Sequence, residues 1–154
     1  MTEARPWKPP ATPDLVSFII VKDPQATLDF ARKVLGAEAR KPPLLRGDGS
    51  IWNMEIACGE GVIIVSGDDG GFEVPGFIYA FVPNSDQAHA AALEAGATAI
   101  MPPTSQFYGI RDGGVRDANG TIWWFGTHVE DVPADELQER AYAEEKKRHE
   151  GAGG

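Results

Sequence analysis

The segment that decides the fold is VSFIIVKDPQATLDFARKVLGAE, residues 16–38. It opens on β-branched and aromatic residues, which are typical of a buried strand. Asp23 followed by Pro24 is the pattern of a helix N-cap with proline in the first helical position. Apolar residues then recur at helical spacing until Gly36, a typical C-terminal cap. The segment therefore predicts a strand followed by a helix over 24–35.

The same pattern begins again further along the chain. Four features recur at an offset of about 60 residues, which indicates an internal duplication. Residues 16–22 recur as 76–82, and residues 62–67 recur as 121–127. The pairs Gly36-Ala37 and Pro42-Pro43 recur as Gly96-Ala97 and Pro102-Pro103. Further strands expected at 51–57, 97–101 and 114–117 make each half a β-α-β-β-β unit.

We therefore predict an α+β fold in which two tandem βαβββ modules form one curved, cup-shaped sheet of eight strands. The first module is expected at 15–70 and the second at 71–130, and each is too small to bury its own sheet face. A Pro-rich arm at 1–14 precedes them. A C-terminal helix at 131–150 and a disordered tail at 151–154 follow.

Local signals add detail to the second half. Ser85 is a plausible cap for a helix at 85–95, and His89 within that helix is expected to contact solvent. Pro102-Pro103 predicts a turn after a short strand. The C-terminal helix has few apolar residues, so it is expected on the surface or against a partner subunit.

Composition limits the possible partners. The chain has 154 residues and a formal net charge of −9, which argues against binding to nucleic acid or to an anionic membrane. No apolar run is long enough to span a bilayer, and no targeting signal is recognisable. Cys58 is the single cysteine, which excludes an internal disulfide and fits the cytoplasm. No cation neighbours it in sequence, so a nucleophilic role is not favoured.

The sequence resembles the vicinal oxygen chelate superfamily, which includes glyoxalase I, extradiol dioxygenases, and bleomycin-resistance and fosfomycin-resistance proteins. Two segments carry the resemblance, namely 16–38 and QFYGIRDGGVRDANGTIWWFGTHVED at 106–131. The second is similar to the closing signature of the PhnB-like branch. The resemblance implies paired βαβββ modules and, in the enzymes, a divalent metal held by His and Glu at four positions.

Carried onto this chain, those four positions fall on Val16 or Ser17, Ile64, Phe77 and Trp124. Three cannot ligate a metal, and the first offers a hydroxyl at best. We therefore expect neither a metal nor another cofactor. A metalloenzyme with a displaced site that uses Glu55, His128 or groups from a second subunit is kept as an alternative.

Period-two alternation predicts which strand side chains face the cup. The result is an apolar, aromatic concavity with a few polar groups, which is typical of a small-molecule site. The expected ligand-binding residues are Asn53, Glu55, Ile64, Phe77, Tyr79, Tyr108, Arg111 and Trp124.

Each of these residues also has a structural interpretation. The aromatic residues could simply fill the cup, and Glu55 could face solvent at a strand edge. Arg111 and Arg116 are favoured as ion-pair partners of the adjacent Asp112 and Asp117 rather than as clamps for an anionic ligand. Tyr108 could pack instead of binding.

The favoured function is a glyoxalase/bleomycin resistance-like protein that has lost the metal site and binds a small aromatic or amphipathic molecule. One alternative is a metal-independent lyase or isomerase with Glu55 or Tyr108 as the acid or base. Another is a glyoxalase or dioxygenase with a displaced metal. A symmetric homodimer is expected, with the arm and the C-terminal helix available to contact the second copy.

Overall fold

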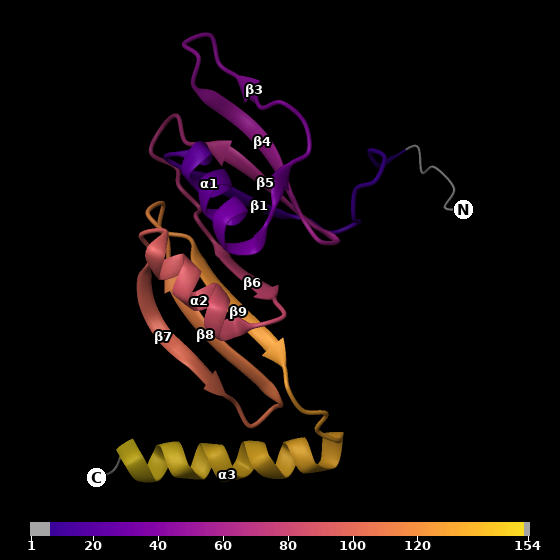
Figure 1. The fold of residues 1–154 in the computed structure, drawn as a ribbon, viewed down its shortest axis with the longest axis vertical. Coiled ribbons are helices and arrows are strands. Elements are labelled where there is room, and N and C mark those ends of the chain that lie inside the picture. Colours follow the sequence, from indigo (N-terminus) through magenta and orange to yellow (C-terminus); the bar gives the residue numbers. More distant parts are fainter. Residues whose placement is uncertain (1–6, 153–154) are drawn as a thin grey trace.

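The computed structural model describes residues 7–152 (Figure 1). Its elements confirm the α+β class, the two modules and the C-terminal helix. In chain order they are β1 (Ser17–Val21), α1 (Pro24–Leu35), β2 (Glu38–Ala39), β3 (Leu44–Leu45), β4 (Ile51–Cys58), β5 (Gly61–Gly67), β6 (Phe77–Phe81), α2 (Ser85–Glu94), β7 (Thr98–Ser105), β8 (Ile110–Arg116), β9 (Ile122–His128) and α3 (Ala134–Ala152).

The two halves have the same topology, which confirms the duplication. The first sheet has the order β1-β5-β4-β2, with the short β3 also pairing with β4. The second has the order β6-β9-β8-β7. In each half the first strand pairs in parallel with the last strand, and the intervening helix crosses between them. The short strands β2 and β3 lie at positions where no strand was expected from the sequence.

The strands form two sheets, whereas a single eight-stranded sheet was expected. Within residues 7–152, no strand pairing joins edge strands β1 and β6. The two modules instead meet through α1 and α2 and share one hydrophobic core, in which Phe30 of α1 contacts Trp123 of β9. The outer edge of β1 is also occupied, because Ile20 and Val74 exchange two backbone hydrogen bonds of 2.9 Å.

The helices begin at side-chain caps. The Asp23 carboxylate accepts a hydrogen bond from the backbone N–H of Ala26 at 3.2 Å, and Gly36 ends α1 in the left-handed region with φ of 65°. In α2 the cap is Asn84, one residue before the predicted Ser85, because the Asn84 amide oxygen reaches the N–H of Gln87 at 3.1 Å. His89 is buried in α2, with 7% exposed, contrary to the expected solvent contact.

Pro102 and Pro103 lie inside β7, not in a turn as expected. Strand β7 is an edge strand of the second sheet, and an edge tolerates residues that lack a backbone donor. The pairing register between β7 and β8 shifts between Met101 and Thr104, where the two prolines interrupt the ladder. The turn follows later, before β8 begins at Ile110.

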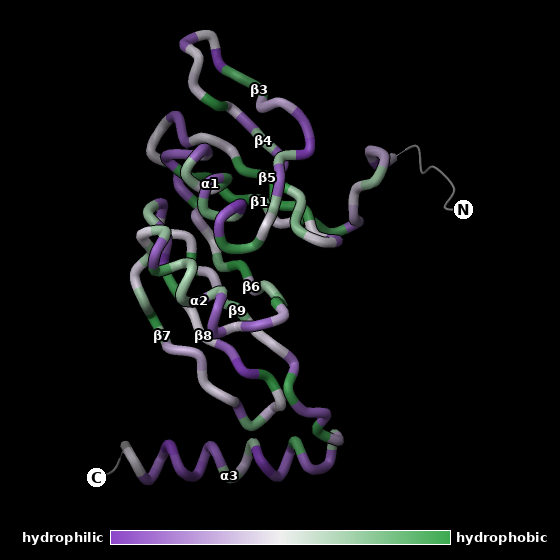
Figure 2. The backbone as a smooth tube through the Cα atoms, viewed as in Figure 1, coloured by the Kyte–Doolittle hydropathy of each residue, from purple (hydrophilic) through white to green (hydrophobic). Residues whose placement is uncertain are grey.

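Helix α3 lies across the end of the second module, at the bottom of Figure 1, and is hydrophilic along most of its length (Figure 2). It continues to Ala152, so Gly151 and Ala152, expected in a disordered tail, are helical. The last two residues, like residues 1–6 of the arm, lie outside the described range. Leu137, Arg140 and Ala141 form a half-buried face, and Arg140 donates a 3.1 Å hydrogen bond to the carbonyl oxygen of Phe107.

Among the helices of residues 7–152, none combines the length and the apolar character needed to cross a bilayer.

Candidate functional site

Each sheet has an open face, which we define as the face turned away from α1 and α2. On the covered face of the second sheet, Trp123 and Phe125 are fully buried in the core. On its open face, Phe77, Tyr79 and Phe81 are 59%, 41% and 71% exposed. The alternation predicted from the sequence is therefore confirmed, and the open face is lined with aromatic rings.

Two glycines let these rings lie flat against the sheet. A Cβ atom at Gly114 would overlap the Trp124 ring, and one at Gly126 would overlap the Tyr79 phenol. The Trp124 ring also stacks on Phe77, with centroids 5.5 Å apart and an interplanar angle of 26°. Packing on both sides orders the indole, and it remains only half-buried. The open face therefore carries a fixed aromatic platform.

A buried carboxylate lies beside this platform. Asp112 of β8 is 1% exposed and accepts three side-chain hydrogen bonds. The hydroxyl groups of Tyr79 and Tyr108 donate to its Oδ2 atom at 2.8 and 2.7 Å. The Gln106 amide donates to Oδ1 at 3.1 Å. Three donors, one from β6 and two from the loop between β7 and β8, thus converge on one acidic side chain.

This arrangement determines the protonation of the two phenols. Burial, together with the hydrogen bonds to Asp112 and the proximity of its carboxylate, raises the pKa of Tyr79 and of Tyr108 well above the usual range. Both side chains therefore stay neutral at physiological pH. Because each hydroxyl proton is directed at Asp112, each phenol oxygen presents its lone pairs to the remaining space.

Arg111 does not pair with Asp112, contrary to the ion pair expected from their adjacency. Successive strand residues face opposite sides of a sheet, so Arg111 points to the covered face. There its guanidinium binds Asp86 of α2, with Nε–Oδ2 and Nη2–Oδ1 distances of 2.7 and 3.0 Å. Asp117, expected to pair with Arg116, instead accepts a 2.8 Å hydrogen bond from the indole N–H of Trp123.

Asp112 is the site residue that sequence reasoning missed. A signal for it was available, since in strand β8 the side chains of Arg111 and Asp112 must point apart. The two glycines that follow Asp112 were a second signal, because small residues on a strand mark places where another group approaches the backbone closely. Tyr79, Tyr108, Phe77 and Trp124 were predicted, and the structure brings them together on one open face.

The other predicted residues lie elsewhere. Asn53, Glu55 and Ile64 are half-buried on the open face of the first sheet, with Glu55 opposite Ile64 in the β4–β5 ladder. Glu55 pairs with Arg40 at 3.1 Å and with Lys41 at 2.7 Å. It is thus neither unpaired in an apolar cup nor free at a strand edge.

Arg40 links Glu55 to the N-terminal arm. Its guanidinium also donates hydrogen bonds to the carbonyl oxygens of Pro10 and Ala11, at 3.2 and 3.1 Å. The Glu55 carboxylate therefore anchors the cation that holds residues 10–12 against the first module, which is a structural role.

The metal positions implied by the family resemblance do not fit a metal. Ile64, Phe77 and Trp124 present aliphatic and aromatic groups, none of which is a metal ligand. Within residues 7–152, no group of three or more His, Cys, Asp or Glu side chains is arranged to hold an ion. Of the alternative ligands, His128 is exposed and contacts Asp131, with Nε2 and Oδ1 2.9 Å apart.

Cys58 is the last residue of β4 and pairs with Gly61, the first residue of β5. Burial raises the pKa of its thiol, which disfavours the thiolate needed by a nucleophile.

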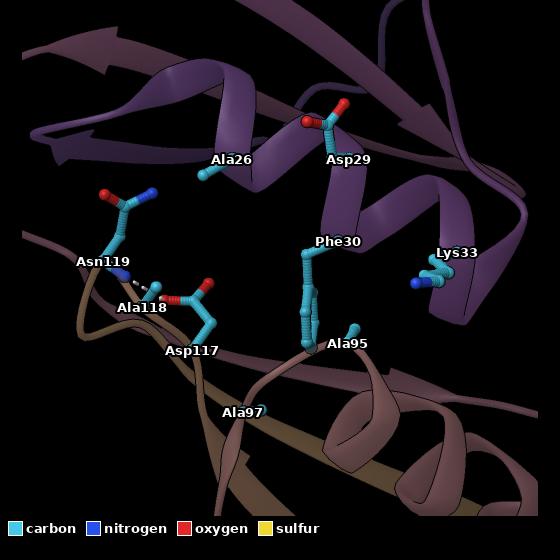
Figure 3. A pocket seen from close by; sticks show the side chains of 9 residues that line it. All are labelled: Ala26, Asp29, Phe30, Lys33, Ala95, Ala97, Asp117, Ala118 and Asn119. Atoms are coloured by element: carbon cyan, nitrogen blue, oxygen red, sulfur yellow. Dashed lines mark hydrogen bonds between the residues drawn. The ribbon is translucent and has the colours of Figure 1, made fainter.

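A cavity of about 230 Å³ lies at the seam between the modules (Figure 3). Two of its polar side chains, those of Asn119 and Asp117, are used by the fold itself. The Asn119 amide donates to the carbonyl oxygen of Asp23 at 2.7 Å and to Oγ1 of Thr27 at 3.0 Å, and it accepts from the Asp23 N–H at 3.0 Å. The Asp117 carboxylate accepts from Trp123 and from the backbone of the same turn. The hydrogen bonds of Asn119 therefore join the two modules.

Known structures resemble this chain in fold. TioX from Micromonospora sp. ML1 superimposes with a TM-score of 0.62 at 22% identity, over 75% of this chain and 98% of that one. A member of the glyoxalase/bleomycin resistance protein/dioxygenase superfamily from Sphaerobacter thermophilus DSM 20745 has a TM-score of 0.59 and 21% sequence identity. The match covers 75% of this chain and 98% of that one. A glyoxalase/bleomycin resistance protein/dioxygenase family enzyme from Burkholderia phytofirmans PsJN has a TM-score of 0.57 and 16% sequence identity. The match covers 74% of this chain and 97% of that one.

The chain therefore has the fold of the glyoxalase/bleomycin resistance/dioxygenase superfamily, as predicted. No protein-family model and no curated protein matches its sequence.

Proposed function

We propose that this protein binds a small aromatic or amphipathic molecule, without a metal, on the open face of the second sheet. The single observation that carries the proposal is the ordered platform of Phe77 and Trp124 beside the Tyr79–Asp112–Tyr108 cluster. Stacking on such a platform stabilises a planar ligand. The polar cluster supplies the few directed contacts that a small-molecule site needs for specificity.

The composition of the open face argues against a filled core. Phe77 and Phe81 are more than half exposed, whereas residues that only fill a core are covered. Exposed aromatic groups gathered on one face mark a site for a ligand or a partner. The superfamily fold supports the same proposal, because TioX and the superfamily members above share the two-module arrangement.

We also propose a homodimer in which the second copy completes the cup. The open faces of both sheets carry exposed apolar groups, including Phe18 on β1 and Phe81 on β6, and both strands are sheet edges. The first sheet of one copy and the second sheet of its partner can then line one cavity, while the ligand remains between them. The PhnB-like branch and the cytoplasmic location stay predictions from the sequence.

The metal-independent lyase or isomerase is less well supported. Glu55 is engaged by Arg40 and Lys41, which removes it from the aromatic platform. The raised pKa of Tyr108 makes its phenolate a rare species at neutral pH, and its proton is already donated to Asp112. The displaced-metal enzyme has no supporting ligand set in the described residues.

Calorimetric titration with 2-naphthalenemethanol, a neutral planar probe, tests the binding function. Saturable binding by the native protein is expected, together with a raised melting temperature. Trp124→Ala should weaken binding by at least about tenfold, because it removes the stacking surface.

Trp52→Ala is the matched control. Trp52 is also an exposed tryptophan, but it is the second residue of β4 in the first sheet. Its side chain is on the same face as the buried Met54 and Ile56, and Arg46 lies over its ring. Its removal should leave binding unchanged. Equal losses in both variants would show that the probe binds exposed indoles at random, which would contradict the proposed site.

A further inference from the structure

We propose that the ligand of this open face carries a protonated nitrogen, which binds to the phenol oxygens of Tyr79 and Tyr108. This inference rests on the proposed function and specifies the chemistry of its ligand. It follows from the charge of Asp112, from the direction of the hydrogen bonds around it, and from the rings beside it.

Asp112 is a buried carboxylate held by neutral donors. Its partners are two phenols and one amide, and none of its described contacts is with a cation. A buried anion is ordinarily stabilised by an opposite charge as well as by hydrogen bonds. The neighbouring Arg111, which could have supplied that charge, is engaged by Asp86 on the other face of the sheet. The cluster therefore carries an uncompensated negative charge.

The phenols transmit this charge to the open face. Each hydroxyl donates to Asp112, so each oxygen can only accept a hydrogen bond from a ligand. Donation to an anion polarises an O–H group and strengthens the acceptor character of its oxygen. A ligand with N–H donors is thus matched, and one with a positive charge is matched best. A ligand carboxylate would face two acceptors and a like charge.

The charges around the two phenols also favour a cationic ligand. Tyr79 and Tyr108 are 41% and 38% exposed, so a ligand can contact both side chains. Three arginines are the nearby cations to consider. Arg140 of α3 binds the carbonyl oxygen of Phe107, but it pairs with Glu130 and Glu136 at 2.8 Å each. Arg148 of α3 faces Tyr108 but pairs with Glu144 at 3.2 Å. Arg116 is on the same strand face as Asp112 but four residues away, about 13 Å along the strand.

The aromatic rings favour the same charge. A cation above the face of a tryptophan or phenylalanine ring is attracted by the ring electrons. Trp124 and Phe77 offer such faces beside the phenol oxygens, and the net charge of −9 attracts cations to the molecule as a whole.

Three probes of one shape test the inference. They are 2-(aminomethyl)naphthalene, which is an ammonium ion at pH 7, the neutral 2-naphthalenemethanol and the anionic 2-naphthoate. Calorimetric titration of the native protein should give the ammonium probe at least about tenfold tighter binding than the alcohol, because charge-assisted hydrogen bonds are stronger than neutral ones. The naphthoate should bind most weakly.

Asp112→Asn removes the charge and keeps the size of the side chain. It should reduce the preference for the ammonium probe over the alcohol to less than about threefold, while the alcohol still binds. Asp29→Asn is the matched control, since it removes the same charge from an exposed position on α1, where its partner is the neutral Gln25 and Arg111 keeps its own partner. Its preference should equal that of the native protein. Should Asp112→Asn fail to fold, Tyr108→Phe removes one acceptor oxygen and should also lower the preference.

The outcomes separate the two proposals. If none of the three probes binds the native protein, the proposed function itself fails, and the inference fails with it. If all three bind equally well, the aromatic site stands but the inference is wrong. A preference that persists in full in Asp112→Asn would assign it to the rings alone, which also overturns the role given to Asp112.

Discussion

The burial of Asp112 is possible only because every donor around it is in place. Removing one partner from a buried polar group costs more than the net contribution of the hydrogen bond, because the remaining group is left unsatisfied. The cluster draws its donors from β6, from the turn after β7 and from the residue before that turn. A function built on Asp112 is therefore sensitive to changes both in β6 and in the loop between β7 and β8.

The phenols provide a direct readout of this cluster. Their raised pKa values mean that the Tyr79 and Tyr108 protons are held more firmly in the folded chain than in the unfolded one, where the value is 10.0. This contribution to stability is fully present below pH 10 and is lost as the pH rises through the folded values. Asp112→Asn should shift phenol ionisation, followed by absorbance at 295 nm, to lower pH.

The titration is cleanest in a Tyr142→Phe background. The chain has three tyrosines, so this exposed substitution on α3 leaves only the two phenols of the cluster. The same background with Asp112 intact is the reference. Identical titration curves with and without Asp112 would contradict the hydrogen bonds described above.

Gly114 is predicted to be intolerant of even one methyl group. The Cβ atom of Gly114→Ala would overlap the Trp124 ring, which lies against the backbone. We expect a loss of about 1–3 kcal/mol in the free energy of unfolding, the usual cost of overpacking, together with a changed tryptophan emission. Urea denaturation measures the first and fluorescence the second.

Gly70→Ala is the control for this substitution. Gly70 has open space where a Cβ atom would lie, and its change should stay within about 0.5 kcal/mol. A Gly114→Ala protein as stable as the control would mean that Trp124 can leave the platform at no cost, and the ring would not be an ordered binding surface.

At the scale of elements, sequence reasoning succeeded wherever a local signal fixed the structure. The cap at Asp23, the stop at Gly36 and the apolar periodicity between them determine α1 without help from the rest of the chain. Pro102 and Pro103 show the opposite case. Their local signal favours a turn, but the position of β7 at a sheet edge, a tertiary fact, allows them in a strand.

The candidate site follows the same division. Alternation placed Phe77, Tyr79 and Trp124 on one face from sequence alone, because side-chain direction in a strand is a local property. The partners of Asp112 come from positions up to 33 residues apart, and no spacing rule predicts which donor reaches it. The resemblance supplied the fold, but its metal positions fall on side chains with a different chemistry.

One turn residue adds hydrogen bonds to the apolar contact between the modules. Asn119 makes three hydrogen bonds to Asp23 and Thr27 at the start of α1. Asn119→Ala should lower the free energy of unfolding by about 1–3 kcal/mol, since each partly exposed hydrogen bond contributes about 1 kcal/mol or less. Gln25→Ala, which removes an amide that bonds only within α1, should cost about 0.5 kcal/mol or less. Equal costs would show that Asn119 does not join the modules.

At the scale of the molecule, the helices of both modules share one core, and this leaves both sheets with an uncovered face. The helix-covered faces of the two sheets are buried in this core, whereas their open faces carry exposed residues. An exposed aromatic surface of this kind is stabilised by association. The binding site and the interface with a second copy are therefore expected to be linked, because the open faces take part in both.

Phe18→Asp tests that link. Phe18 lies on β1, in the module that does not contain Asp112, and is 54% exposed. Light scattering of the native protein should give about 33 kDa, twice the 16.6 kDa of one chain. Phe18→Asp should lower the measured mass toward that of one copy, because a buried unpaired charge opposes association. The variant should also bind 2-naphthalenemethanol more weakly, since the partner then no longer covers the platform. Leu93→Asp, which places the same charge at an apolar residue of α2 that is 41% exposed, should alter neither property. The contrary result has two parts: the native protein has a mass of 16.6 kDa, and it binds the probe only as tightly as Phe18→Asp does. This result would show that one copy forms the whole site.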